Sequence, residues 1–176
     1  QAIGNEIYTR YHGKVRPRYV TSDRFTSDVV SGIRNKRFDD VKRKYRDCDV
    51  LIIDDIQFIG GKEKTEEEFF QMFNALYQNN KQIIISSDRP PQSIPILEDR
   101  LRSRFEAGLT TDIGYPEYEM RLAIIREKLE EKQHTLTDAV IDLVARRVKK
   151  NIREIEGVLN KIVFHEQTKK TKLTDK

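Results

Sequence analysis

The sequence predicts an α/β fold, in which helices cover a parallel sheet, followed by a small all-helical subdomain. Three observations support this prediction. Residues 50–53 (VLII) and 82–86 (QIIIS) are short runs rich in β-branched residues, which is typical of parallel strands buried on both faces. Helical patterns alternate with these runs through the first 113 residues. Beyond Pro116 only helical patterns follow.

The first elements are predicted from the spacing of apolar residues. Apolar side chains at every fourth position indicate a helix over residues 2–11, and residues 15–21 form a strand candidate. Ser22 is the expected N-cap of a polar helical region over residues 23–46. The strand at 50–53 comes next, so helices and strands alternate from the start of the chain.

A helix is expected between the two apolar strands. Gly60-Gly61 interrupts the chain, and Thr65 with Glu68 matches a capping box that opens the helix. Its apolar face collects residues at helical spacing: Phe69, Phe70, Phe73, Leu76 and Tyr77.

The rest of the chain is predicted from similar signals. A short basic helix is expected around residues 98–105 and a further strand at 108–113, before a hinge at 114–116 (GYP). Three amphipathic helices follow, the third opened by Asn151. The expected organisation is an α/β core at 1–114 with a helical insertion at about 23–46, a helical subdomain at 115–166, and a basic tail or linker at 167–176.

Composition limits the classes of protein to consider. A single cysteine, Cys48, and three histidines among 176 residues argue against a disulfide scaffold and against a thiolate or histidine metal site. No apolar run has the length of a membrane span, and the first residues lack a signal-peptide pattern, so we expect a cytoplasmic protein. Residues 1–46 carry a net charge of +7, which suits either a polyanion-facing surface or a solvated helix face.

Asp54 and Asp55 directly follow a buried strand. The carboxyl ends of parallel strands are where open α/β sheets bind ligands. In nucleotide hydrolases such a carboxylate holds Mg²⁺ through water, and a neighbouring acid orients the attacking water. The alternative is that both residues only end the strand and cap the next turn.

A phosphate-binding loop of the form G-x-x-x-x-G-K-[ST] is absent from the sequence. The two Gly-Lys pairs, Gly13-Lys14 and Gly61-Lys62, are followed by Val15 and Glu63, and neither has a glycine five positions earlier. We therefore expect these residues alone to bind no ATP and to be inactive as an enzyme.

Three arginines and one further aspartate are candidate site residues. Arg100 and Arg104 lie four positions apart, on one face of the expected basic helix, where two guanidinium groups suit a phosphate or carboxylate. Arg153 lies in the first turn of a helix, and Asp88 follows the second apolar strand. The alternatives are ion pairs with neighbouring acids for Arg100 and Arg104, and a turn-forming role for Asp88.

Three segments, taken in order, resemble the DnaA family of bacterial replication initiators, which belong to the AAA+ ATPases: 51–76, 82–109 and 151–160. The resemblance extends through nearly the whole chain. It implies a P-loop-type parallel sheet, a helical lid at 115–166, and ATP and Mg²⁺ as cofactors. It also implies that the family's Walker A loop, the central strand before it and the C-terminal double-strand DNA-binding domain lie outside these residues.

The resemblance assigns nucleotide roles to four residues. Asp54 corresponds to the Walker B residue that holds Mg²⁺, and Asp55 to the neighbouring acid that helps to activate water. Asp88 corresponds to the sensor-1 position. Arg153 corresponds to the sensor-2 arginine of the lid.

It also implies partners. Arg104 corresponds to the arginine finger that reaches the ATP of an adjacent protomer, and Arg100 to another contact between protomers. The insertion at 23–46 would let protomers stack into a filament. Regulatory or helicase-loading proteins and acidic phospholipid are further partners of this kind of initiator.

The resemblance places four residues on single-stranded origin DNA: Val30, Lys62, Lys64 and Thr65. Lysine ammonium groups and a helix N-terminus can meet phosphates. No aromatic stacking platform is obvious, so we expect backbone contact rather than base reading.

Two further expectations concern stability and the alternative functions. In the family's sheet the strand before the Walker A loop lies between 82–86 and 108–113, so without it two strand edges lack partners and we expect low stability of the isolated chain. The alternatives to an initiator are a DnaA-like regulator acting on the initiator, or a nucleotide-free protein-binding platform. The insertion and the run from Lys62 to Thr65 favour the initiator.

Overall fold

The computed structural model describes residues 2–169, so most of the expected basic tail at 167–176 lies outside the described residues. The chain divides into two compact units, Gln1–Thr110 and Thr111–Lys176. This division lies a few residues before the hinge that the sequence predicts.

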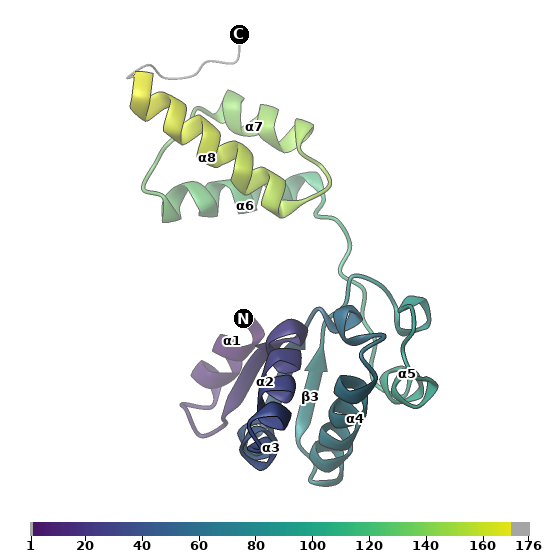
Figure 1. Cartoon of the computed structure of the whole chain (residues 1–176). Coiled ribbons are helices and arrows are strands. Elements are labelled where there is room, and N and C mark those ends of the chain that lie inside the picture. The colour runs from purple at the N-terminus through teal and green to yellow at the C-terminus, as the bar shows by residue number, and fades with distance from the viewer. Residues whose placement is uncertain (1, 170–176) are drawn as a thin grey trace. The chain divides into compact units, whose positions relative to one another are not determined.

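The first unit contains a parallel sheet of three strands in the order β1-β2-β3: Pro17–Thr21, Val50–Asp54 and Gln82–Ile85 (Figure 1). Thr21 is opposite Asp54, and Ile53 is opposite Ile85. Because β2 is the central strand, Leu51 and Ile53 are fully buried. The predicted α/β class is confirmed.

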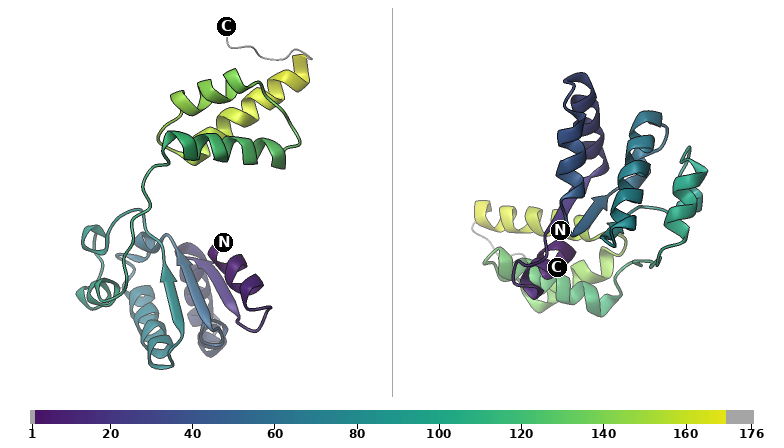
Figure 2. Two further views of the ribbon diagram at one scale, coloured as in Figure 1. Left: turned by 180° about the vertical axis from the view of Figure 1, so that it is seen from behind. Right: turned by 90° about the horizontal axis from the view of Figure 1, so that it is seen from below.

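Helices cover both faces of this sheet (Figures 1 and 2). α1 (Ala2–Arg10) lies on one face, and a Cβ on Gly4 would lie 3.2 Å from Cδ1 of Ile52, so helix and strand approach closely. The other face packs on three helices, which share one aromatic and aliphatic core with β2: α2 (Ser22–Arg34), α3 (Phe38–Arg46) and α4 (Glu63–Gln78).

The helical region predicted at 23–46 consists of two helices. The chain turns after α2 at Lys36, whose φ is +55°. α3 then folds back so closely that a Cβ on Gly32 would lie 2.6 Å from Cγ2 of Val41. The cap of α2 is Thr21, whose hydroxyl accepts from the Arg24 N–H at 3.3 Å, and not Ser22 as predicted.

The capping box predicted at Thr65 and Glu68 is wrong. After a short 3-10 helix, η1 (Ile56–Ile59), helix α4 begins at Glu63, so Thr65 lies inside its first turn and is buried. The preceding loop is held instead by Glu66, whose carboxylate accepts from the Gly61 N–H at 2.8 Å.

The strand predicted at 108–113 is also wrong. After η2 (Pro91–Ser93) and α5 (Asp99–Glu106), residues 107–116 form no strand. Leu109 and Ile113 are 100% and 92% exposed, so within residues 2–169 this segment is not packed against the sheet. Among the described residues the outer edge of β3 has no partner strand.

The second unit contains the three predicted helices: α6 (Tyr118–Glu131), α7 (Asp138–Arg147) and α8 (Ile152–Lys169). Ile125, Ala145, Ile155 and Leu159 form the fully buried part of their core. The buried Arg121 guanidinium donates to two backbone carbonyl groups, which compensates its burial. None of the helices within residues 2–169 is long and apolar enough to cross a membrane.

Candidate functional site

Asp54 is the last residue of β2, and its carboxylate is held from both neighbouring strands. Oδ2 accepts from the Tyr19 hydroxyl of β1 at 2.7 Å, and Oδ1 accepts from the Ser86 hydroxyl, which follows β3. The parallel topology brings these groups to one edge of the sheet. Asp54 is half-buried there, so it stays open to a ligand from solvent.

These hydrogen bonds shift the pKa values of both partners. The Ser86 and Tyr19 hydroxyls hold the pKa of Asp54 below its ordinary value, because both donate to the ionised carboxylate. The same bond to Asp54 raises the pKa of Tyr19 to about 12. Asp54 is therefore an anion, and Tyr19 a neutral donor, at physiological pH.

Asp55 has an unusual backbone conformation. Its φ of +58° places it in the left-handed region, which few residues other than glycine adopt. Its N–H donates to Oγ of Ser86 at 3.2 Å, and its carbonyl accepts from Oγ of Ser22 at 2.8 Å. The Asp55 carboxylate accepts from Gln57 and does not cap the following 3-10 helix. Strained backbone of this kind concentrates at functional sites.

Sequence reasoning missed the residues that hold the acidic pair: Tyr19, Ser22 and Ser86. Ser86 could have been predicted from its position directly after β3. Parallel strands end at the same edge of a sheet, so a residue that follows β3 lies near the end of β2. No local signal identifies Tyr19, whose contact with Asp54 depends on the register of β1 against β2.

Asp88 follows β3 by three residues, but its carboxylate pairs with Arg89 and not with a residue of the Asp54 site. Its carboxylate forms a two-point pair with the guanidinium of Arg89, at 2.8 and 2.9 Å. Asp88 is exposed, and Ser86 rather than Asp88 contacts Asp54.

Arg100 and Arg104 share one face of α5, as predicted, and both stack on aromatic rings of α4. The Arg100 guanidinium carbon lies 4.5 Å from the Phe70 ring centre, and that of Arg104 lies 5.7 Å from the Tyr77 ring centre. Arg100 also pairs with the Glu98 carboxylate, so the ion-pair alternative holds for it. Arg104 is exposed and forms no ion pair with any residue between 2 and 169, so its hydrogen-bond donors are available to an external acceptor.

Arg153 belongs to the second unit, in the first turn of α8. Its N–H donates to Oδ1 of Asn151 at 2.8 Å, which confirms Asn151 as the cap of this helix.

Three of the four DNA candidates present side chains at the surface of the first unit. Val30 is 48% exposed on α2. Nζ of Lys62 lies 3.6 Å from Asp23, seven positions before Val30 on the same helix face, so these side chains share one side of the unit. Lys64 is exposed. Thr65 is only 3% exposed, so its hydroxyl does not reach the surface.

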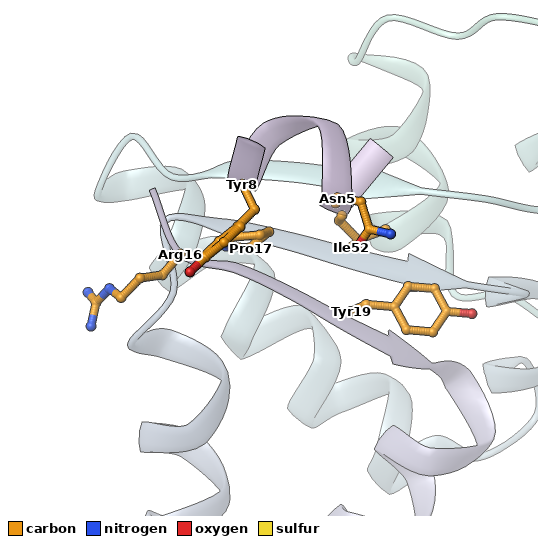
Figure 3. A pocket seen from close by; sticks show the side chains of 7 residues that line it. Asn5, Tyr8, Arg16, Pro17, Tyr19 and Ile52 are labelled. Carbon is orange, nitrogen blue, oxygen red and sulfur yellow. The ribbon is translucent and has the colours of Figure 1, made fainter. Parts of the chain in front are cut away.

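A pocket of about 440 Å³ lies between α1 and strands β1 and β2 (Figure 3). Tyr8 and Asn5 line it from α1, and Pro17 and Tyr19 from β1. Tyr19 extends from the pocket toward the carboxyl ends of the strands (Figure 3). Within the described residues, no group of three acidic, histidine or cysteine side chains forms a ready metal cage.

A parallel sheet whose central strand ends in Asp54, in a unit that also carries the arginine-bearing helix α5, is typical of nucleotide-binding α/β domains. The family model described as the bacterial DnaA ATPase domain matches residues 1–112. The chain belongs to this family.

Relatives and solved structures agree with this assignment. The chromosomal replication initiator protein DnaA of Caldanaerobacter subterraneus is 51% identical over 92% of this chain, and that of Deinococcus radiodurans is 50% identical over 92%. The chain spans only about a third of the length of these relatives (36% and 34%).

Two solved structures resemble the fold. Domain III of DnaA from Thermotoga maritima has a TM-score of 0.94 at 35% identity, over 99% of this chain and 73% of that one. A replication initiator DnaA bound to AMPPCP and single-stranded DNA has a TM-score of 0.80 at 38% identity, over 96% and 53%.

Proposed function

We propose that this chain is part of the ATPase domain of a bacterial replication initiator, and that the whole initiator engages ATP and single-stranded DNA when the origin duplex opens. The observation that carries the proposal is the ionised Asp54, held by Tyr19 and Ser86 at the carboxyl edge of the sheet. The matching relatives are named as replication initiators, which favours an initiator over a regulator. A related structure contains both a nucleotide analogue and single-stranded DNA.

Asp54 fits a Mg²⁺ site. Mg²⁺ uses one or two carboxylates, retains several waters and takes its remaining ligands from phosphates, which suits one ionised and half-exposed aspartate. Mg²⁺ supplies charge neutralisation on the phosphates of ATP when it is bound. Asp54 would hold it through water, and the adjacent Asp55 would orient the attacking water. Asp88 and Arg153 would contact the nucleotide.

Arg104 is proposed as the residue that reaches ATP on an adjacent protomer. Its guanidinium is exposed, is supported by the Tyr77 ring and lacks an acidic partner among residues 2–169. Arg100 would contact the neighbouring protomer from the same face. Assembly into a filament would then depend on ATP, because each triphosphate would be contacted from two sides.

Single-stranded DNA would lie along the side that Lys62 and Val30 share. Lys62 and Lys64 would bind phosphates, and Val30 would pack against the extended strand. Thr65 would contribute through its place at the start of α4, since its side chain is buried.

We also propose a cytoplasmic location and contacts with regulatory or helicase-loading proteins. The basic residues 1–46, with their net charge of +7, are the part of the chain that would meet acidic phospholipid.

The decisive experiment measures binding of a fluorescent oligo-dT to the chain at several salt concentrations. We expect salt-dependent binding, with Lys64→Ala weakening it and reducing the log–log salt slope by about 0.7, the value for one phosphate contact on a single strand. Lys161→Ala, an exposed lysine of α8, is the matched control and should leave binding unchanged. Absence of salt-dependent binding by the wild-type chain would contradict the proposal.

A further inference from the structure

Glu66 is a buried carboxylate that the proposed chemistry does not use. It is only 2% exposed, and acidic side chains are seldom buried this completely without a compensating interaction. Glu66 forms no ion pair with any cation between residues 2 and 169. Backbone N–H groups compensate its burial instead.

Each oxygen of Glu66 accepts from a different segment of the chain. Oε1 accepts from the Gly61 N–H at 2.8 Å, and Oε2 accepts from the Glu98 N–H at 2.9 Å. Gly61 lies in the loop before α4, and Glu98 is the residue that opens α5. One carboxylate thus joins two segments that are 37 positions apart in the sequence.

The two segments also pack directly on each other. A Cβ on Gly60 would lie 2.7 Å from the Pro95 carbonyl oxygen, so only glycine allows this approach. Ile96 has a φ of +57°, a strained conformation for a β-branched residue, and it is 79% exposed. Burial therefore does not hold Ile96 in place, and its side chain lies beside Gly61, where an added Cβ would be 3.7 Å from Cγ2 of Ile96.

The Glu66 carboxylate connects the two candidate binding surfaces, which are the proposed DNA-contacting lysines and the arginine-bearing helix α5. Lys62 and Lys64 directly follow the Gly60-Gly61 turn. On the other side, the Glu98 side chain pairs with Arg100 of α5. Glu66 and Glu98 thus form a continuous chain of contacts between the loop before α4 and Arg100.

We propose that Glu66 couples the DNA-contacting start of α4 to the arginine-bearing helix α5. This inference rests on the proposed function and adds regulation to it. Phosphates seated at Lys62 and Lys64 shift the Gly61 N–H, and the shift changes the Glu66 bond to Glu98. Since such coupling is reciprocal, contact of a neighbouring protomer with α5 changes DNA affinity by the same factor.

The test measures amide hydrogen exchange by NMR in the whole chain, with and without oligo-dT. In Glu66→Gln the amide group has one acceptor oxygen and one donor nitrogen, so it can satisfy only one of the two N–H groups. We expect the Gly61 or Glu98 amide to exchange about tenfold faster in this variant, and the Glu98 amide to respond to DNA only in the wild type. Glu67→Gln, at an exposed position of the same helix, is the matched control and should change neither result.

Gly60→Ala tests the same linkage without altering Glu66. The added Cβ pushes the two turns apart, so exchange at Glu98 should again accelerate. Unchanged exchange at Gly61 and Glu98 in both variants overturns the inference, as does DNA binding by the wild type without a response at Glu98. If the wild-type chain binds no DNA, the proposed function fails, and exchange in the free chain alone then decides whether Glu66 links the two turns.

Discussion

The Tyr19 hydroxyl donates a 2.7 Å hydrogen bond to Oδ2 of Asp54 across two parallel strands. The bond from Ser86 and this bond hold the pKa of Asp54 below its ordinary value at the edge of the sheet.

Tyr19→Phe should raise the pKa of Asp54 toward its ordinary value, because one donor to the ionised carboxylate is removed. Asp54 has a lowered pKa in the folded state, so its stabilising contribution is present above the unfolded pKa and is lost as the pH falls through the folded pKa. The variant should therefore lose about 0.5–1.5 kcal/mol of the free energy of unfolding at neutral pH and less in acid. Urea unfolding at pH 7 and pH 3 measures both values. An equal loss at the two pH values would argue against an ionised acceptor.

Lys81→Met should raise the pKa of Asp49. The Lys81 ammonium, at 2.7 Å from Oδ1, is the main reason that the pKa of Asp49 is lowered to about 2. Stability that depends on this pair is present above the unfolded pKa, near 3.9, and is lost as the pH falls toward 2. An NMR titration of the Asp49 carboxyl carbon should show the midpoint moving upward in Lys81→Met. Lys14→Met, at an exposed lysine of the same unit, should leave the midpoint in place.

Phe105→Ala should destabilise the first unit by about 2–3 kcal/mol. The Phe105 ring contacts Phe69 and Phe73, with ring centres 6.1 and 6.2 Å apart, and it is only partly buried, so the loss falls below the usual range for a core phenylalanine. Urea unfolding monitored at the amide signals of β2 measures the effect. Arg104→Ala, one position away, should cost less than about 0.5 kcal/mol, since exposed side chains contribute little. A comparable cost for both variants would mean that Arg104 supports the fold rather than a partner.

The chain should bind no ATP with Mg²⁺ when titrated in a calorimeter. Asp54 supplies one carboxylate, but the sequence contains no G-x-x-x-x-G-K-[ST] segment to hold the phosphates. Asp54→Asn should leave this result unchanged. Micromolar or tighter binding would show that another part of the chain holds the triphosphate.

The predictions from sequence succeeded where the pattern of residues is local. The apolar runs of β2 and β3 and the periodicity of α6, α7 and α8 are each visible within a short window, and each element formed. The strand predicted at 108–113 failed because a strand needs a partner, and Leu109 and Ile113 have none among the described residues. The capping box failed because α4 begins at Glu63, two residues before Thr65.

The same difference between local patterns and long-range contacts applies to the candidate site. Asp54 and the shared face of Arg100 and Arg104 were predictable from spacing. The two hydroxyl groups that bind Asp54 were not predictable, because strand order and register bring Tyr19 and Ser86 to Asp54. The expected low stability of the isolated chain stays a prediction, which cooperative unfolding of the chain at the midpoint of an intact domain would contradict.

The parallel topology has a kinetic consequence for the acidic site. Tyr19 and Asp54 are 35 positions apart in the chain, and Asp54 and Ser86 are 32 apart. Such distant pairings slow folding, because long loops must close before the contacts are gained. The bond from Tyr19 needs only β1 and β2, but the bond from Ser86 also needs β3. During synthesis, Asp54 therefore gains both of its hydrogen bonds only after the segment carrying Ser86 has left the ribosome.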